Sequence, residues 1–250
     1  MRRGPAFRIS LVAVCSAFGC ASYSSHKEAR TIDPGTFRLD VSAEALNARP
    51  RSGATAFFNG ARPAPWDDTE MAGTRPTVEV QVRYGVASGF DLGLKTTLSS
   101  IELNGTVQLV RGPHFDLALA PAIQGAMGTS GEDEGWGMTT LKLPVLADLR
   151  FGSAGEHAVV FGPAVARAWG QGTGRNSPYS IGAVLVGGSI GLSLADGPNF
   201  RFIPEIAVYT TVAGHGVALP GYVVRVPPDV GGGQPTFIQA GIGFAFGRTQ

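Results

Sequence analysis

Few side chains in this chain are suited to catalysis, and those few are scattered. The four histidines have no partner at the spacing of a metal site. Hydrolysis of a peptide or a lipid needs a base, an orienting group and a nucleophile close together. The only candidates for such a set are the adjacent acids Asp67 and Asp68 together with His215. Adjacent acids and a Gly-His-Gly turn are usually just solvated, so we predict a non-enzymatic protein without catalytic residues, metal ligands or cofactors, with a hydrolase as the weaker alternative.

Cys20 is a candidate for a different chemistry, the attachment of lipid. Three arginines within the first eight residues precede an apolar run over 9–19, which is typical of a bacterial secretory signal and too short to span a bilayer. The run ends in Ala17-Phe18-Gly19-Cys20, which resembles a lipobox with alanine in place of the usual leucine. We therefore predict a signal peptide over 1–20 with lipidation of Cys20. The alternative is ordinary cleavage near Ala21.

Composition limits the class of protein. The 250 residues include 36 glycines and 17 prolines, and only 16% are charged, which favours one all-β domain over a helical bundle. The 20 basic and 19 acidic residues nearly balance, which argues against a nucleic-acid partner. Both cysteines lie within the first twenty residues, so the mature domain has no internal disulfide.

The elements that would position any functional group are short stretches of alternating apolar and polar residues. The clearest spans 77–84, where Val78, Val80 and Val82 share one face and Glu79, Gln81 and Arg83 share the other. The predicted strands are 36–46, 77–84, 90–98, 101–110, 115–126, 139–151, 158–169, 179–194, 200–212 and 236–246. The pattern predicts an antiparallel up-and-down transmembrane β-barrel of about ten strands over 36–250, preceded by a polar periplasmic tether over 21–35.

Glycine and proline disturb this pattern in places. Four prolines lie inside predicted strands, at positions 121, 144, 163 and 204, and each removes a ladder hydrogen bond. The pair Gly187-Gly188 predicts a bulge or bend.

The lengths of the connections and the positions of the aromatics indicate an orientation. Connections after even strands are short, whereas those over 47–76, 127–138, 170–178 and 213–235 are long and are predicted to be extracellular. The aromatics predicted at periplasmic strand ends are Phe37, Tyr84, Phe90, Phe115, Phe151, Phe200, Phe202, Phe244 and Phe246. Those predicted at the outer ends are Trp136, Trp169, Tyr179 and Phe237. Two aromatic rings are typical of a membrane barrel.

The hairpin over 83–94, a strand, a tight turn and a strand, resembles those of bacterial outer-membrane β-barrel proteins of unassigned function. The segment 237–246 is similar to their closing strand, although four further residues follow Phe246. The resemblance implies location in the outer membrane of a Gram-negative bacterium, with outer-membrane lipids as partners. The alternative fold is a soluble sandwich, or a closed ligand-binding barrel with an apolar interior.

The predicted lumen is rich in charge. Alternation directs ten prominent charges inward: Arg38, Asp40, Glu44, Glu79, Arg83, Lys95, Glu102, Lys142, Arg201 and Glu205. With Asp91, Asp116, Asp148 and Arg150 they make six positive and eight negative charges. Glu79, Arg83 and Lys95 lie on neighbouring strands within reach of cross-strand pairing.

These charges form either an interlocked network or a thin hydrated passage. The first favours a structural barrel that interacts through its outer loops, and the second favours a narrow pore or transporter for small solutes. The loops 47–76 and 213–235 would bind an extracellular ligand, with Phe57, Phe58, Trp66 and Tyr222 as contact residues. Neither the ligand nor the oligomeric state can be inferred from the sequence.

Overall fold

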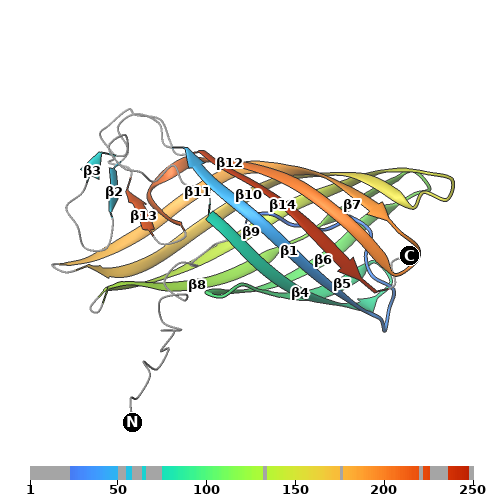
Figure 1. The fold of residues 1–250 in the computed structure, drawn as a ribbon, viewed down its shortest axis with the longest axis horizontal. Helices are drawn as coiled ribbons and strands as arrows, with labels where there is room; N and C mark the ends of the chain where they lie inside the picture. Colours follow the sequence, from blue (N-terminus) through green and yellow to red (C-terminus); the bar gives the residue numbers. More distant parts are fainter. Residues whose placement is uncertain are drawn as a thin grey trace, which may run out of the picture.

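Ten long strands close into an antiparallel barrel in the computed structural model (Figure 1). The structure describes residues 23–49, 55–57, 64–65, 75–131, 134–174, 177–219, 222–225 and 236–247. The wall consists of β1 (Phe37–Arg49), β4 (Arg75–Ala87), β5 (Phe90–Thr96), β6 (Ser100–Arg111), β7 (Phe115–Leu119) continued by β8 (Ala122–Gly131), β9 (Glu134–Phe151), β10 (His157–Gly174), β11 (Ser177–Ala195), β12 (Phe200–Leu219) and β14 (Thr236–Phe246). Pairing of β1 with β14 closes the barrel, so no strand of the wall keeps a free edge.

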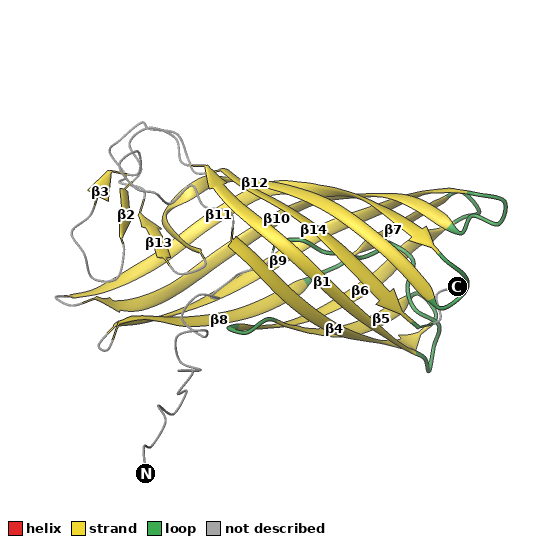
Figure 2. Ribbon diagram, in the orientation of Figure 1, coloured by secondary structure: helices red, strands yellow, loops and turns green. Residues whose placement is uncertain are grey.

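The two ends of the barrel differ. Short turns at 88–89, 112–114, 152–156 and 196–199 lie at one end, which we call the short-turn end (right in Figure 2). At the opposite, long-loop end, three short strands continue the pairing of β12: β13 (Tyr222–Arg225), β2 (Thr55–Phe57) and β3 (Ala64–Pro65). These pairings join the two longest predicted loops, 47–76 and 213–235, to each other.

The predicted fold class and strand order are confirmed, with longer strands at the long-loop end. The segments 127–138 and 170–178, predicted as loops, are mostly strand. Their pairing continues across each hairpin, as Gly128 opposite Trp136 and Gly172 opposite Tyr179 show. Glycine is frequent there and interrupts the alternation of apolar and polar residues. The alternation therefore ends several residues before the hydrogen-bonded ladder does.

The prolines are accommodated without loss of the strands. Pro121 lies between β7 and β8, which share β6 and β9 as neighbours, so the predicted fifth strand is one strand with a break. Pro163 lies where the pairing of β9 with β10 is locally interrupted, whereas Pro144 and Pro204 stay in register opposite Ala164 and Ile242. Of the bulge or bend predicted at Gly187-Gly188, the bulge is excluded, because β11 keeps register with both neighbours there and shifts against β12 only between residues 182 and 185.

The outside of the barrel is apolar and the inside is polar, the reverse of a soluble protein. Leu92, Leu94 and Leu103 are exposed, whereas charged residues between them in sequence are buried. This distribution excludes the alternative of an apolar interior and fits a surface in contact with lipid. The described residues include no helix long and apolar enough to cross a membrane.

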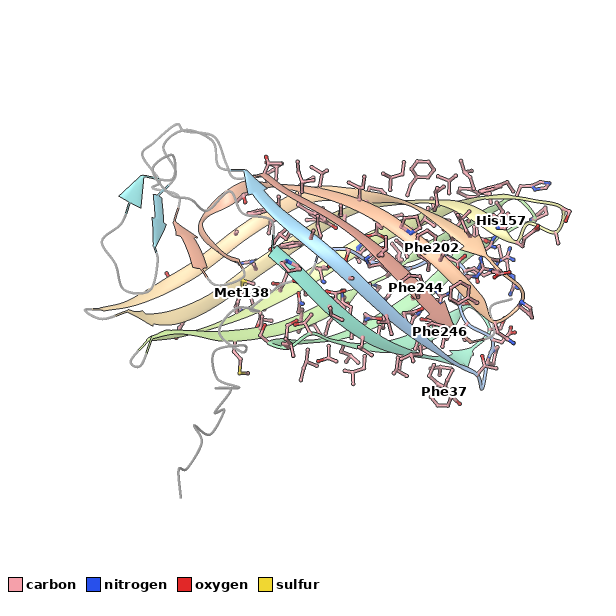
Figure 3. The ribbon with its side chains drawn as sticks, in the orientation of Figure 1. Phe37, Met138, His157, Phe202, Phe244 and Phe246 are labelled. Atoms are coloured by element: carbon pink, nitrogen blue, oxygen red, sulfur yellow. The ribbon has the colours of Figure 1, made fainter. Side chains whose placement is uncertain are left out.

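Aromatic side chains gather at the short-turn end. Phe37 is 64% exposed and packs against Tyr84 with ring centroids 4.6 Å apart, and Figure 3 shows Phe37, Phe244 and Phe246 near the same end. Phe237 lies at the long-loop end of β14 as predicted, but it is fully buried and points into the lumen, so it is not part of an outer aromatic ring. Trp169 is exposed on the outer surface, and the side chains of Trp136 and Tyr179 lie outside the described set.

Candidate functional site: the lumen and the segment inside it

All ten predicted lumen charges lie inside the barrel, each exposed by 6% or less. They are Arg38, Asp40, Glu44, Glu79, Arg83, Lys95, Glu102, Lys142, Arg201 and Glu205. Strict alternation along β1, β4, β5, β6, β9 and β12 turns each of them away from the apolar outer face. The lumen is therefore the place where the chain concentrates its charge.

The chain's own N-terminal residues fill this space. Residues 23–32, which we call the lumen segment, were predicted to be part of a periplasmic tether, and this is wrong for the described part of 21–35. Tyr23, His26, Lys27, Glu28, Ala29 and Ile32 are each exposed by 4% or less. A polar segment becomes buried here because the wall offers partners for its donors and acceptors.

The lumen segment runs from Tyr23, toward the long-loop end, to Ile32, near the short-turn end. Pro34 forms a bridge with Gly85 near the short-turn end of β4, and Tyr23 packs between Tyr209 and Phe237, with ring centroids 5.2 and 6.0 Å away. Gly85 permits the chain at Asp33 to approach β4 closely, because a Cβ at position 85 would lie 2.1 Å from the Asp33 carbonyl oxygen. Phe237 thus points inward to meet Tyr23.

Wall side chains accept hydrogen bonds from the backbone N–H groups of the lumen segment. Glu205 accepts from Ser25 at 2.8 Å and from His26 at 2.9 Å. Asp148 accepts from Ala29 at 2.9 Å, and Asp91 accepts from Ile32 at 3.2 Å. Carboxylates on three strands, together with Gln239 of β14, which accepts from Tyr23 at 2.9 Å, thereby satisfy a backbone that has no secondary structure of its own.

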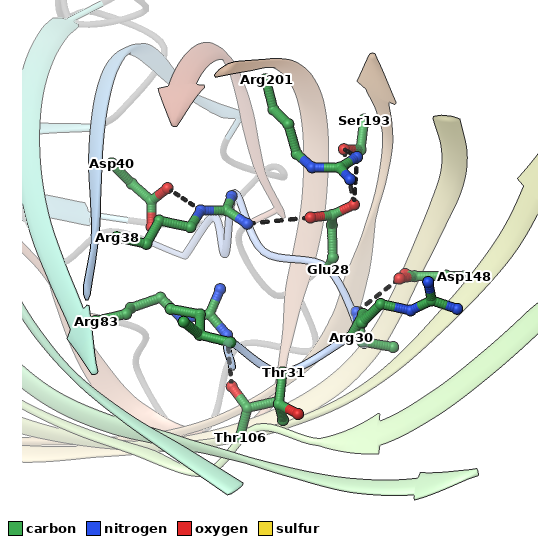
Figure 4. A network of polar contacts seen from close by, with 12 residues as sticks. Glu28, Arg30, Thr31, Arg38, Asp40, Arg83, Thr106, Asp148, Ser193 and Arg201 are labelled. Carbon is green, nitrogen blue, oxygen red and sulfur yellow. Dashed lines mark hydrogen bonds and ion pairs between the residues drawn. The ribbon is translucent and has the colours of Figure 1, made fainter. Parts of the chain in front are cut away.

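Glu28 is held by a cluster of arginines (Figure 4). Its carboxylate lies 3.0 Å from Arg38, 3.0 Å from Arg201 and 3.8 Å from Arg150, and it accepts a hydrogen bond from Ser193 at 2.9 Å. Four strands contribute these partners, so Glu28 links β1, β9, β11 and β12 across the lumen near the short-turn end. Such charge-assisted contacts are strong in a site shielded from water.

The cations of the lumen segment meet acidic or amide partners. The imidazole Nε2 of His26 lies 2.7 Å from Glu44, and Lys27 donates to Asn104. The guanidinium of Arg30 lies 3.0 Å from Asp116. The segment therefore presents its positive and negative side chains to wall groups that complement each of them.

The wall charges also pair with one another. Lys95 lies 3.3 Å from Glu79 across the β4–β5 pair, as cross-strand reach suggested. Arg83 pairs with Asp91 at 2.6 Å rather than with Glu79, and it donates to Thr106 at 3.3 Å. Lys142 pairs with Glu102.

The lumen segment compensates the charge of the wall. The buried wall groups comprise six positive and eight negative charges, an excess of two negative. Within the segment Lys27 and Arg30 exceed Glu28 by one positive charge, and a protonated His26 adds a second. The segment and the wall together approach neutrality, which lowers the electrostatic cost of burying so many ions.

Small inward residues along β14 leave space for the lumen segment. Its inward positions after Gln239 are Gly241, Gly243 and Ala245. A Cβ at Gly243 would lie 3.2 Å from Nδ1 of His26. Three features of the sequence indicate a filled lumen and stand against the predicted tether: these small inward residues, the excess of acid on the wall and the polar run Ser24–Glu28.

The remaining candidates are not brought together. Asp67 and Asp68 lie outside the described residues, and His215 lies in β12 with a side chain outside the described set. Within the described ranges, no group of three or more His, Cys, Asp and Glu side chains could hold a metal ion.

Cys20 and the predicted signal peptide 1–20 also lie outside the described residues, and lipidation stays a prediction. Replacement of Cys20 by serine should abolish incorporation of labelled palmitate, because the thiol is the attachment point for the acyl chains. The barrel should stay inserted, because its wall does not depend on this thiol. Unchanged incorporation would contradict the choice of Cys20, and no incorporation in the native chain would favour plain cleavage.

No family model matches this chain, and no curated protein does. Solved structures do match it. The outer membrane protease OmpT from Escherichia coli has a TM-score of 0.54 at 9% identity, covering 89% of this chain and 100% of that one. Neisserial surface protein A has a TM-score of 0.41 at 9% identity, covering 84% of this chain and 96% of that one. The likeness to OmpT shows that this chain has the fold of bacterial outer-membrane β-barrels.

Proposed function

We propose that this protein is a non-enzymatic barrel of the Gram-negative outer membrane that is closed by its own N-terminal segment and acts through its long-loop end. The burial of the lumen segment carries this proposal, since residues 23–32 occupy the space that a solute would need. A narrow pore for small solutes is the alternative, and it requires wall charges that face water. Instead, wall carboxylates such as Glu205 and Asp148 are bonded to the segment.

The long-loop end is the part of the molecule that we assign to interaction. Strands β13 and β2 pair there and tie together the loops 47–76 and 213–235. Loops held by a rigid scaffold are common sites of recognition. Phe57, Phe58, Trp66 and Tyr222 stay candidates for contact with an extracellular ligand, although their side chains lie outside the described set.

The test of closure is conductance. Refolded native protein inserted in a planar bilayer should give no single-channel steps, because the segment and its ion pairs fill the lumen. Resistance of the inserted barrel to protease serves as the control for insertion. Regular steps from protein that passes this control would contradict the closed barrel and support the pore.

The orientation can be tested on whole cells. Cysteines placed at Gly131 and Gly174, at the long-loop end, should react with a reagent that does not cross the membrane. A cysteine at Ser153, in the turn between β9 and β10, should not react. A background without Cys20 avoids labelling of the native thiol. Equal labelling at all three positions would refute the assigned orientation.

A further inference from the structure

We infer that the lumen is a peptide-binding site, occupied here by the chain's own lumen segment as an internal ligand. The inference rests on the proposed closed barrel and adds what the site recognises: the backbone of a peptide without regular secondary structure, and the order of its charges. The site would accept a separate peptide of matching sequence.

Recognition of the backbone comes from the wall. Glu205 binds two successive N–H groups, and Asp148, Asp91 and Gln239 bind one each. An ion-lined channel for solutes has no reason to place acceptors at the spacing of a peptide backbone. Acceptors aimed at backbone N–H groups bind any peptide of suitable conformation, so they supply affinity without choosing a sequence.

Recognition of the sequence comes from the different surroundings of two neighbouring side chains, Lys27 and Glu28. Glu28 enters the cluster of Arg38, Arg150 and Arg201, while the preceding Lys27 reaches Asn104 beside Glu102. Exchange of these two neighbours would place an ammonium among three guanidinium groups. Like charges at such distances are strongly unfavourable in a buried site, so the wall discriminates by the order of charges.

The segment is joined to the wall by a short connection that is itself exposed. Pro34 and Gly35 are exposed at the short-turn end, and a Cβ at Gly35 would have nothing within 4 Å. Beyond this connection, the described contacts that hold residues 23–32 are hydrogen bonds, ion pairs and packing. A cut at Gly35 would leave the segment held in the barrel by noncovalent contacts alone.

The experiment cuts the folded full chain at a protease site built at Gly35 and measures exchange of the released segment for a fluorescent peptide of residues 23–34. The control is the same peptide with Lys27 and Glu28 exchanged, which keeps composition and net charge. The native peptide should bind, and the exchanged peptide should bind at least about thirtyfold more weakly. Equal binding of the two peptides, or binding of neither, would overturn the inference.

The outcome separates the inference from the proposed function. If neither peptide binds while the uncut protein stays closed in the bilayer, the closed barrel is supported and the peptide-binding site is contradicted. If the uncut protein conducts, the proposed function itself falls.

A second measurement needs no cut. In a full-length chain carrying Ser25→Cys without Cys15 and Cys20, Gly243→Leu would place a side chain where His26 lies, whereas Gly125→Leu would extend from a position with nothing within 4 Å of its Cβ. Labelling of the cysteine by a soluble maleimide should become at least about tenfold faster in the first variant and stay unchanged in the second. Equal rates in both would contradict the binding of the segment at β14.

Discussion

Replacement of Glu28 by glutamine is expected to lower the free energy of unfolding by about 3–5 kcal/mol, the usual cost of breaking a buried ion pair. The carboxylate is within 3.0 Å of both Arg38 and Arg201, and its side chain is 2% exposed. Arg38 keeps Asp40 and Arg150 keeps Asp116, so these two arginines retain a carboxylate in the variant. The variant therefore loses the ion pairs that Glu28 makes with Arg38 and Arg201.

The measurement is a urea titration of protein refolded in lipid vesicles. Glu156→Gln is the control, because Glu156 lies partly exposed in the turn between β9 and β10 and a glutamine amide oxygen can still accept the N–H of Ala154, so stability should change by less than about 0.5 kcal/mol. If both substitutions have equally small effects, Glu28 is solvated and the lumen segment does not lock the wall.

Replacement of Arg83 by alanine is expected to have a comparable effect, again about 3–5 kcal/mol, without opening the barrel. Arg83 and Asp91 are both fully buried and lie 2.6 Å apart. Asp91 also accepts the N–H of Ile32, so the lost guanidinium leaves a carboxylate that keeps only part of its compensation. In a hydrated passage, water would screen Asp91, and the same substitution would change ion selectivity while costing little stability.

Unfolding midpoints and bilayer currents of the Arg83 variant decide between these outcomes. The double variant Arg83→Leu with Asp91→Asn serves as the matched comparison, since removal of both charges should cost less than removal of one. Arg111→Ala, at the exposed end of β6, controls for the loss of a basic residue. A variant with altered selectivity and native stability would contradict the closed barrel.

The sequence by itself determined where the wall strands lie and which of their side chains face the lumen. Alternation with period two follows from backbone geometry, so Val80 and Val82 against Glu79 and Arg83 fixed both the strand and the faces of β4. The same parity places Phe237 inward, because Phe246 and Phe244 point outward on β14. Proximity to a strand end alone therefore does not place Phe237 in an interfacial ring, because the parity of its position on β14 turns the side chain into the lumen.

Only the tertiary structure decided which inward groups meet. Arg83 pairs with Asp91 rather than Glu79 because the β4–β5 register and the twist of the wall bring that carboxylate within reach. No local pattern encodes such a choice, since every inward charge on neighbouring strands satisfies the same alternation.

The lumen segment is the clearest case of this limit. Residues 23–32 have no periodicity, and their partners are far away in sequence, as with Glu28 and Arg201 or Ala29 and Asp148. A polar run of this composition has the same appearance whether it is solvated or enclosed. It is buried because the closed wall supplies carboxylates, arginines and small residues at matching positions, and those positions exist only once the barrel has formed.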